Sequence, residues 1–194
     1  MRLAIRPADN RIGLQRQHLR RLTVDAVLVA LALVLSIAEH WIPLDLIVPV
    51  PGIKLGLANI VTLFALLRLH VSDAAAILIV RCLMIGVING PMTMLFSLSG
   101  GLTALLLMWL LAHWEDRVFS VIGISLAGAA AHNIGQVAMA GLVLHEPLLL
   151  VTYLPVLLLT SLAAGTLTGL AAFPVVRRFR KSGCRPYPEM KETC

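Results

Sequence analysis

Apolar segments long enough to cross a lipid bilayer recur through most of this sequence. They follow one another from Val24 to Phe173, in windows of about 20 residues, the length that a helix needs to span the hydrocarbon core. The alternating pattern of a membrane β-barrel is absent, so helices are the structure that can satisfy the backbone in lipid. Charged residues make up 13% of the chain, against about a quarter in a soluble domain. The sequence therefore predicts an all-α polytopic membrane protein.

Turn signals divide the apolar region into six expected transmembrane helices. They cover residues 23–42, 55–69, 74–88, 92–112, 118–144 and 149–176. Asn89-Gly90-Pro91 is the strongest of the turns, because all three residue types favour chain reversal. We expect residues 1–22 to form a basic cytoplasmic arm, residues 23–176 a six-helix membrane domain and residues 177–194 a basic cytoplasmic tail. Residues 43–54 form a proline-rich loop on the outer side.

Positive charge is concentrated at the two ends of the chain. Twelve of the 16 lysines and arginines lie before residue 22 or after residue 176. Basic segments beside membrane spans stay on the cytoplasmic side, and six spans put both ends there. Only Phe179 and Tyr187 are interleaved with these charges, so we expect no nucleic-acid partner. The pattern predicts a multi-pass protein of the cell membrane with cytoplasmic N- and C-termini.

Arg81 is the first candidate for ligand binding. It lies about 12 Å into the third expected helix, counted from Asp73. A charged side chain near the middle of a bilayer is costly, so it should face the protein interior or a wet cavity and find an anion there. The alternatives are pairing with a carbonyl at a helix end or extension of the side chain to the inner interface.

Lys54 is the second candidate, in the segment Pro51-Gly52-Ile53-Lys54-Leu55-Gly56-Leu57-Ala58-Asn59. Glycines let the backbone approach a ligand closely, and the start of the next helix favours an anion. Lys54 and the amides of residues 56–58 would then bind a phosphate or carboxylate. The alternative is a lysine that anchors the span among lipid headgroups.

A third set of polar residues lies on the fifth expected helix. His132 and Gln136 are four residues apart and share one face, with Asn133 beside them. They are expected to hydrogen-bond a polar group of the ligand, together with Asn59; the alternative is hydrogen bonding between helices. Glu39 is interpreted as a solvated residue at a helix end, with a counter-ion for Lys54 as the alternative.

Small residues four apart suggest places where helices approach closely. Ala26 and Ala30 have this spacing on the first expected helix, and Gly165 and Gly169 on the sixth. The three cysteines form no Cys-x-x-Cys pair, and no spacing typical of metal ligands or of a catalytic nucleophile with its base is present. We therefore expect no metal, no cofactor and no enzymatic activity.

Three strings resemble one known family. They are PGIKLGLAN at residues 51–59, Ser-Gly-Gly at residues 99–101 and AHNIGQ at residues 131–136. The family is that of bacterial membrane proteins called Gx transporter or heptaprenyl diphosphate synthase component I, and the resemblance covers about residues 23–173. This family is similar in turn to the substrate-binding S components of energy-coupling-factor (ECF) transporters, which are six-helix bundles.

The resemblance implies roles for several residues. In ECF S components an Ala-x-x-x-Ala motif on the first helix docks on a transmembrane coupling subunit, and Ala26 and Ala30 match it. Ligand binds near the outer face beneath the first external loop, where the comparison places Lys54 and the His132 set. Prenyl diphosphate synthases bind Mg²⁺ and diphosphate through adjacent aspartates, whereas the five aspartates of this chain are widely separated.

The leading prediction is a substrate-binding membrane subunit of a small-molecule transporter, with an anionic or phosphorylated ligand. Because no Walker motif is present, ATPase subunits would be separate chains that act with a transmembrane coupling subunit. The alternative is a non-catalytic membrane accessory subunit in prenyl diphosphate or quinone metabolism. A structural membrane scaffold is the third interpretation.

Overall fold

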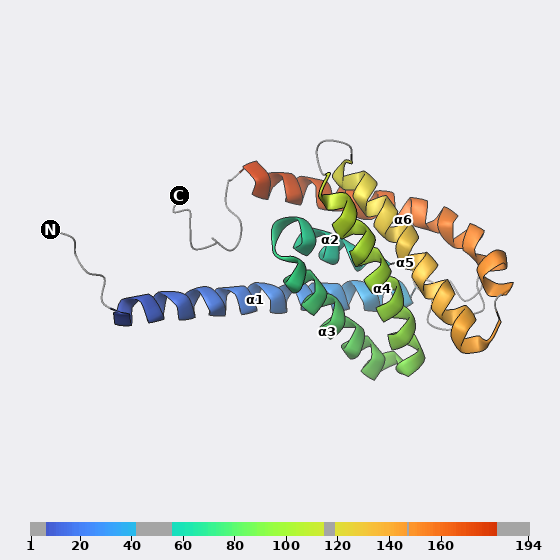
Figure 1. Cartoon of the computed structure of the whole chain (residues 1–194), viewed down its shortest axis with the longest axis horizontal. Helices are drawn as coiled ribbons and strands as arrows, with labels where there is room; N and C mark the ends of the chain where they lie inside the picture. The colour runs from blue at the N-terminus through green and yellow to red at the C-terminus, as the bar shows by residue number, and fades with distance from the viewer. Residues whose placement is uncertain (1–6, 42–55, 115–118, 147, 182–194) are drawn as a thin grey trace.

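The computed structural model describes residues 7–41, 56–114, 119–146 and 148–181. These residues form six α-helices (Figure 1): α1 Pro7–His40, α2 Asn59–Arg68, α3 Val71–Asn89, α4 Pro91–Ala112, α5 Val121–Leu144 and α6 Leu148–Lys181. The predicted all-α polytopic architecture with six helices is confirmed.

Five of these six helices are long and apolar enough to cross a bilayer, and α2 is the exception. It has 10 residues, which extend about 15 Å against a hydrocarbon core of about 30 Å. α2 contacts every other helix of the described chain. The span expected over residues 55–69 is thus a short helix enclosed by longer ones, and its N-terminal end lies inside the bundle.

The first and last helices are longer than the sequence indicates. α1 begins at Pro7 instead of near residue 23, so most of the expected basic arm continues the helix. α6 runs to Lys181 and contains Pro155 and Pro174 in its interior. A proline removes one intrahelical hydrogen bond, a loss that neighbouring groups in membrane helices compensate. The divisions at residues 22 and 176 fall inside these helices and stay predictions from composition.

The central helix of the bundle is α5, and the most peripheral is α1. In their most apolar windows 61% of the α5 residues are buried, against 17% for α1. α5 packs on both α4 and α6, whereas α1 contacts only α2 and α3 among the described helices. The first turns of α1 extend beyond the bundle, at the same end of the molecule as the last turns of α6 (Figure 1).

Gly165 and Gly169 bring α6 against α5. A Cβ atom on Gly165 would lie 2.8 Å from the Cα of Leu126, and one on Gly169 would lie 2.9 Å from the Cα of Ile122. These distances are shorter than any van der Waals contact allows, so larger residues would push the helices apart. The glycine pair therefore permits the close approach that its spacing predicts.

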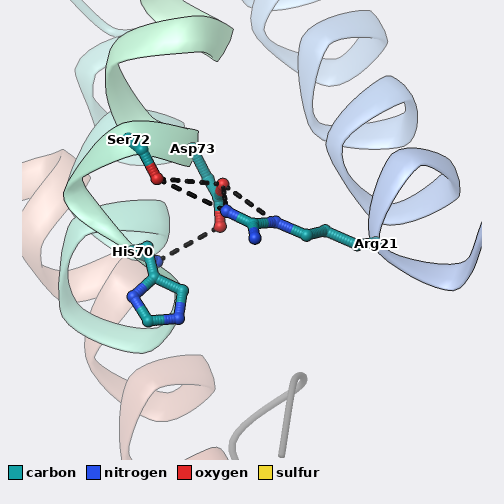
Figure 2. A network of polar contacts seen from close by, with 4 residues as sticks. All are labelled: Arg21, His70, Ser72 and Asp73. Atoms are coloured by element: carbon teal, nitrogen blue, oxygen red, sulfur yellow. Dashed lines mark hydrogen bonds and ion pairs between the residues drawn. The ribbon is translucent and has the colours of Figure 1, made fainter. Parts of the chain in front are cut away.

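A polar network fixes α1 to the beginning of α3 (Figure 2). Arg21 forms an ion pair with Asp73, and its Nε donates to Asp73 Oδ1 at 3.1 Å. A second guanidinium nitrogen donates to Ser72 Oγ at 3.3 Å. Asp73 Oδ2 accepts from the backbone N–H of His70, also at 3.3 Å. Sequence reasoning assigned Arg21 to a basic arm without a partner, and the structure gives it a specific one.

Replacing Asp73 with Asn should lower the free energy of unfolding by about 1 kcal/mol. The Arg21 side chain is 38% exposed, so solvent screens the ion pair and keeps its contribution near that of a surface pair. Thermal unfolding in detergent of Asp73→Asn, Arg21→Gln and the double variant measures the coupling. The two losses should not be additive; full additivity would show that the pair does not hold α1 in place.

Candidate functional site

The predicted ligand-binding residues that the structure describes are all buried in the bundle. Each of these residues is 5% exposed or less; they are Asn59, Arg81, His132, Asn133 and Gln136. Lys54, together with residues 42–55, lies outside the described residues, so its role as a ligand contact stays a prediction. Polar groups inside an apolar membrane bundle require partners. The partners that each side chain has therefore indicate its role.

Arg81 lies in α3 with 3% of its surface exposed. Its guanidinium makes two long contacts, to Ser36 Oγ of α1 at 3.5 Å and to Cys82 Sγ at 3.9 Å. Its Nε is buried and has no hydrogen-bond partner in the described chain. Among the residues that the structure describes, no carboxylate forms an ion pair with Arg81. A permanently charged group is thus buried with weak, neutral partners, which is the arrangement that a bound anion would stabilise.

Glu39, one turn after Ser36 on α1, approaches the start of α2. Its carboxylate accepts a hydrogen bond from the backbone N–H of Leu57, and the residue is 3% exposed. The interpretation of Glu39 as a solvated residue at a helix end is therefore wrong. It fails because α1 packs along α2 instead of ending in water. The Leu57 amide, which the sequence analysis assigned to a ligand anion, binds the carboxylate of the protein itself.

Gly56 makes room for Asn59 and His132 next to this contact. Its backbone has a φ of +83°, a conformation that glycine adopts without strain. A Cβ atom there would lie 2.8 Å from Asn59 Nδ2 and 2.9 Å from His132 Cδ2. The imidazole of His132 on α5 therefore lies against the first turn of α2. Both side-chain amide atoms of Asn59 are buried and have no hydrogen-bond partner among the described residues.

Gly100 of α4 forms the other wall around His132. A Cβ atom on Gly100 would lie 2.7 Å from Gln136 Cγ and 3.1 Å from His132 Cε1. His132 and Gln136 thus face the same helix, as their spacing predicts. Gly56 belongs to the string PGIKLGLAN and Gly100 to the string Ser-Gly-Gly. Both lie next to His132, which belongs to the third string, AHNIGQ.

Asn133 belongs to a different interface from its two neighbours. Its Nδ2 donates to the backbone oxygen of Leu157 on α6 at 2.7 Å. This bond is the hydrogen bonding between helices that the sequence analysis gave as the alternative for the whole set. The structure therefore separates Asn133, which faces α6, from His132 and Gln136, which face α4.

These contacts connect into one buried group, which we call the interior polar cluster. Its members are Ser36, Glu39, Asn59, Arg81, His132 and Gln136. Ser36 and Glu39 are the members that sequence reasoning missed or misplaced. Their spacing of three residues on one helix, next to a span with an internal arginine, was the available signal.

The cluster has the composition of a binding site. It offers a cation, a carboxylate, an imidazole and carboxamides, on parts of α1, α2, α3 and α5 that are held together by packing. Within the described chain no group of three or more His, Cys, Asp or Glu residues is placed to hold a metal ion. What the arrangement can do chemically is bind and orient a polar or anionic molecule.

The predicted docking residues lie away from this cluster. Ala26 and Ala30 are both exposed on α1. Apolar side chains beside them are exposed as well: Val27, Leu31 and Val34. Since α1 contacts only α2 and α3, no other helix of the described chain covers this face.

A comparison with protein families finds one match. The family model described as heptaprenyl diphosphate synthase component I matches residues 28–174. This range contains the whole interior polar cluster and Ala30, and it begins just after Ala26. No curated protein and no solved structure matches the chain.

Proposed function

The chain belongs to the heptaprenyl diphosphate synthase component I family, as its motif strings predict, and from that membership we propose that it is a non-catalytic membrane subunit that binds an anionic small molecule. The observation that carries this proposal is the burial of Arg81 without a carboxylate partner in the described chain. An anion bound at Arg81 would neutralise a charge that is otherwise costly inside a membrane bundle.

The family name supplies the first candidate for the partner. A component of a prenyl diphosphate synthase would act beside a catalytic chain, and a diphosphate is an anion that suits Arg81. The aspartates of this chain are far apart in sequence, whereas prenyl diphosphate synthases bind Mg²⁺ and diphosphate through adjacent aspartates. We therefore assign it a binding role, with the chemistry on another chain.

Native mass spectrometry of the detergent-purified protein tests the ligand-binding function. We expect the protein to retain an anionic molecule and the Arg81→Met variant to lose it. The matched control is Asn133→Leu. Asn133 is also a buried polar residue, but its hydrogen bond goes to α6 and not to the interior polar cluster, so this variant should keep the ligand if it folds. Equal retention of the molecule by wild type and Arg81→Met would refute binding at this site.

The exposed face of α1 favours a second candidate, a substrate-binding subunit of an ECF-type transporter. Ala26 and Ala30 lie on the least buried helix, and small exposed residues at this spacing permit close contact with a helix of another chain. The ligand-binding role of the cluster is the same in both candidates, so they differ in the partner. A coupling subunit with ATPase subunits would replace the synthase.

Ala26→Trp should separate the two partners. In a transporter subunit an indole at this position prevents close helix approach, so we expect uptake to fall at least 10-fold while the purified variant stays folded. Ala163→Trp, at an exposed alanine of α6, is the matched control and should leave uptake unchanged. If Ala26→Trp has no effect and a prenyl diphosphate synthase co-purifies with the protein, the transporter candidate is wrong.

The ends of α1 and α6 support a membrane orientation with both termini in the cytoplasm of the cell. The basic residues that precede residue 22 or follow residue 176 belong largely to these two helix ends, which lie at one end of the molecule (Figure 1). Positive charge flanking membrane spans is retained on the cytoplasmic side. Cysteine accessibility at the first turns of α1, measured in intact cells and in lysed cells, tests this orientation.

A further inference from the structure

Arg81 and Asn59, both members of the interior polar cluster, have buried hydrogen-bonding groups that nothing in the described chain satisfies. Arg81 has its Nε, and Asn59 has both Nδ2 and Oδ1. They are 3% and 5% exposed respectively. An amide with neither its donor nor its acceptor used is expensive to bury. A bound molecule with a donor and an acceptor would satisfy both groups of Asn59.

The two side chains lie within reach of one small molecule. Arg81 contacts Ser36 Oγ at 3.5 Å, and Glu39 lies one turn further along the same face of α1. Glu39 binds the N–H of Leu57, two residues before Asn59. The path from the guanidinium to the Asn59 amide thus runs along one turn of α1 and across the contact between Glu39 and Leu57. It corresponds to a distance on the order of 10 Å. A molecule with one ring and a hydrogen bond at each end covers that distance.

We propose that the ligand carries two recognition groups, an anionic group that binds Arg81 and a planar amide edge that binds Asn59. The amide edge is a carboxamide or a ring lactam, with a donor and an acceptor side by side. Asparagine recognises such an edge through two parallel hydrogen bonds, because it presents one donor and one acceptor in one plane. This inference rests on the proposed ligand-binding function and adds the chemical class of the ligand.

The Asn59 amide and the His132 ring both lie next to Gly56. A Cβ atom on Gly56 would lie 2.8 Å from Asn59 Nδ2 and 2.9 Å from His132 Cδ2, so an imidazole is near the amide that the ligand edge would bind. A purely apolar chain with an acid group at one end would leave the Asn59 amide without partners. An isoprenyl diphosphate has that form, so it satisfies Arg81 and not Asn59.

The test uses small molecules that carry one group or both. Benzoate has the anion alone, benzamide has the amide edge alone, and the three isomers of carbamoylbenzoate and orotate have both. Their dissociation constants are measured by saturation-transfer NMR on the detergent-purified protein. We expect at least one compound with both groups to bind about 10-fold or more tightly than benzoate and benzamide.

Two variants assign the groups to their residues. Asn59→Leu, which conserves side-chain volume, should weaken the best compound about 10- to 100-fold and leave benzoate unchanged. Arg81→Met should weaken both of these compounds. Asn89→Leu, at the end of α3, is the matched control and should change neither dissociation constant. Elution as a single species and an unchanged helical circular dichroism spectrum establish that each variant is folded.

The outcomes distinguish this inference from the proposed function. If no compound with both groups binds more tightly than benzoate, or if Asn59→Leu leaves the best one unchanged, the inference is overturned, while a loss of benzoate binding in Arg81→Met would still support the function. If benzoate and the compounds with both groups bind Arg81→Met and wild type equally, both the function and the inference fail. If water instead of the ligand satisfies Asn59, no compound with both groups should bind more tightly than benzoate, and Asn59→Leu should leave binding unchanged.

Discussion

Arg81→Met is expected to abolish retention of the ligand while leaving the empty protein as stable as wild type or more stable. A charge-assisted hydrogen bond to a buried guanidinium contributes about 1.5–3 kcal/mol, so affinity should fall about 10- to 150-fold. The empty protein loses little, because the partners of Arg81 are a hydroxyl at 3.5 Å and a sulfur at 3.9 Å. Removing a charge that has no carboxylate partner in the described chain from a membrane interior is favourable.

This combination of effects is a signature of function. Removal of a side chain that only supports the fold lowers the stability of the protein. Removal of a group that binds a ligand lowers the affinity for that ligand and can raise the stability. Melting temperatures in detergent and ligand occupancy by native mass spectrometry provide the two measurements. Arg81→Lys should lie between the two proteins in affinity, because it keeps the charge and loses the planar fork of donors.

Arg21→Gln is the matched control for this experiment. Arg21 has an ion pair with Asp73 at the end of the bundle, so its loss should reduce the melting temperature by a few degrees and leave occupancy unchanged. A large drop in the melting temperature of Arg81→Met with unchanged ligand occupancy would assign Arg81 to the fold. The two arginines therefore predict opposite patterns in the same pair of measurements.

The sequence predicted the helices well because membrane spans depend on local composition. Long apolar windows and turn signals place most helix ends within about four residues of their positions in the structure. The departures arise because an apolar window marks the part of a helix that suits lipid and not the whole helix. α1 continues into a basic segment before its apolar part, α6 continues into a basic segment after it, and α2 is a short helix that contacts all the others.

Contacts within the site were harder to predict, because they depend on which helices face each other. Arg81, His132 and Gln136 are unusual residues for a membrane span, so each was recognisable as a candidate by itself. Glu39 was not, because its importance comes from packing beside Leu57. Asn133 and His132 are adjacent in sequence and face different helices. The sequence of one helix does not show which neighbouring helix each of its side chains contacts.

The glycines near this site have a common effect that the sequence alone did not indicate. Gly56 and Gly100 leave space for the imidazole of His132 from two sides, and Gly135 lies in the next turn of α5, against α4. Small residues are thus used here to bring polar side chains of α5 close to α2 and α4. The distance between α4 and α5 should therefore control both stability and ligand binding.

Gly135→Ala is expected to lower the melting temperature by about 4–10 °C and to weaken ligand binding. A Cβ atom at residue 135 would lie 2.9 Å from the backbone oxygen of Ser99 and 3.0 Å from the Cα of Gly100. Backbone atoms cannot rotate away as a side chain can, so the whole of α4 must shift. Overpacking of this kind costs about 1–3 kcal/mol, which corresponds to several degrees for a chain of this length.

Gly123→Ala provides the matched control on the same helix. The nearest atom to a Cβ there is Ser120 Oγ at 3.5 Å, an ordinary contact, so alanine should be neutral or stabilising by up to about 1 kcal/mol through its higher helix propensity. The melting temperature should thus fall in Gly135→Ala and stay unchanged or rise in Gly123→Ala. Because Ser99 Oγ also binds the backbone oxygen of Gly135 at 3.1 Å, a shift of α4 breaks that bond and moves Gly100 away from His132 and Gln136. If Gly135→Ala and Gly123→Ala were equally stable, close packing of α4 on α5 would not set the geometry of the interior polar cluster.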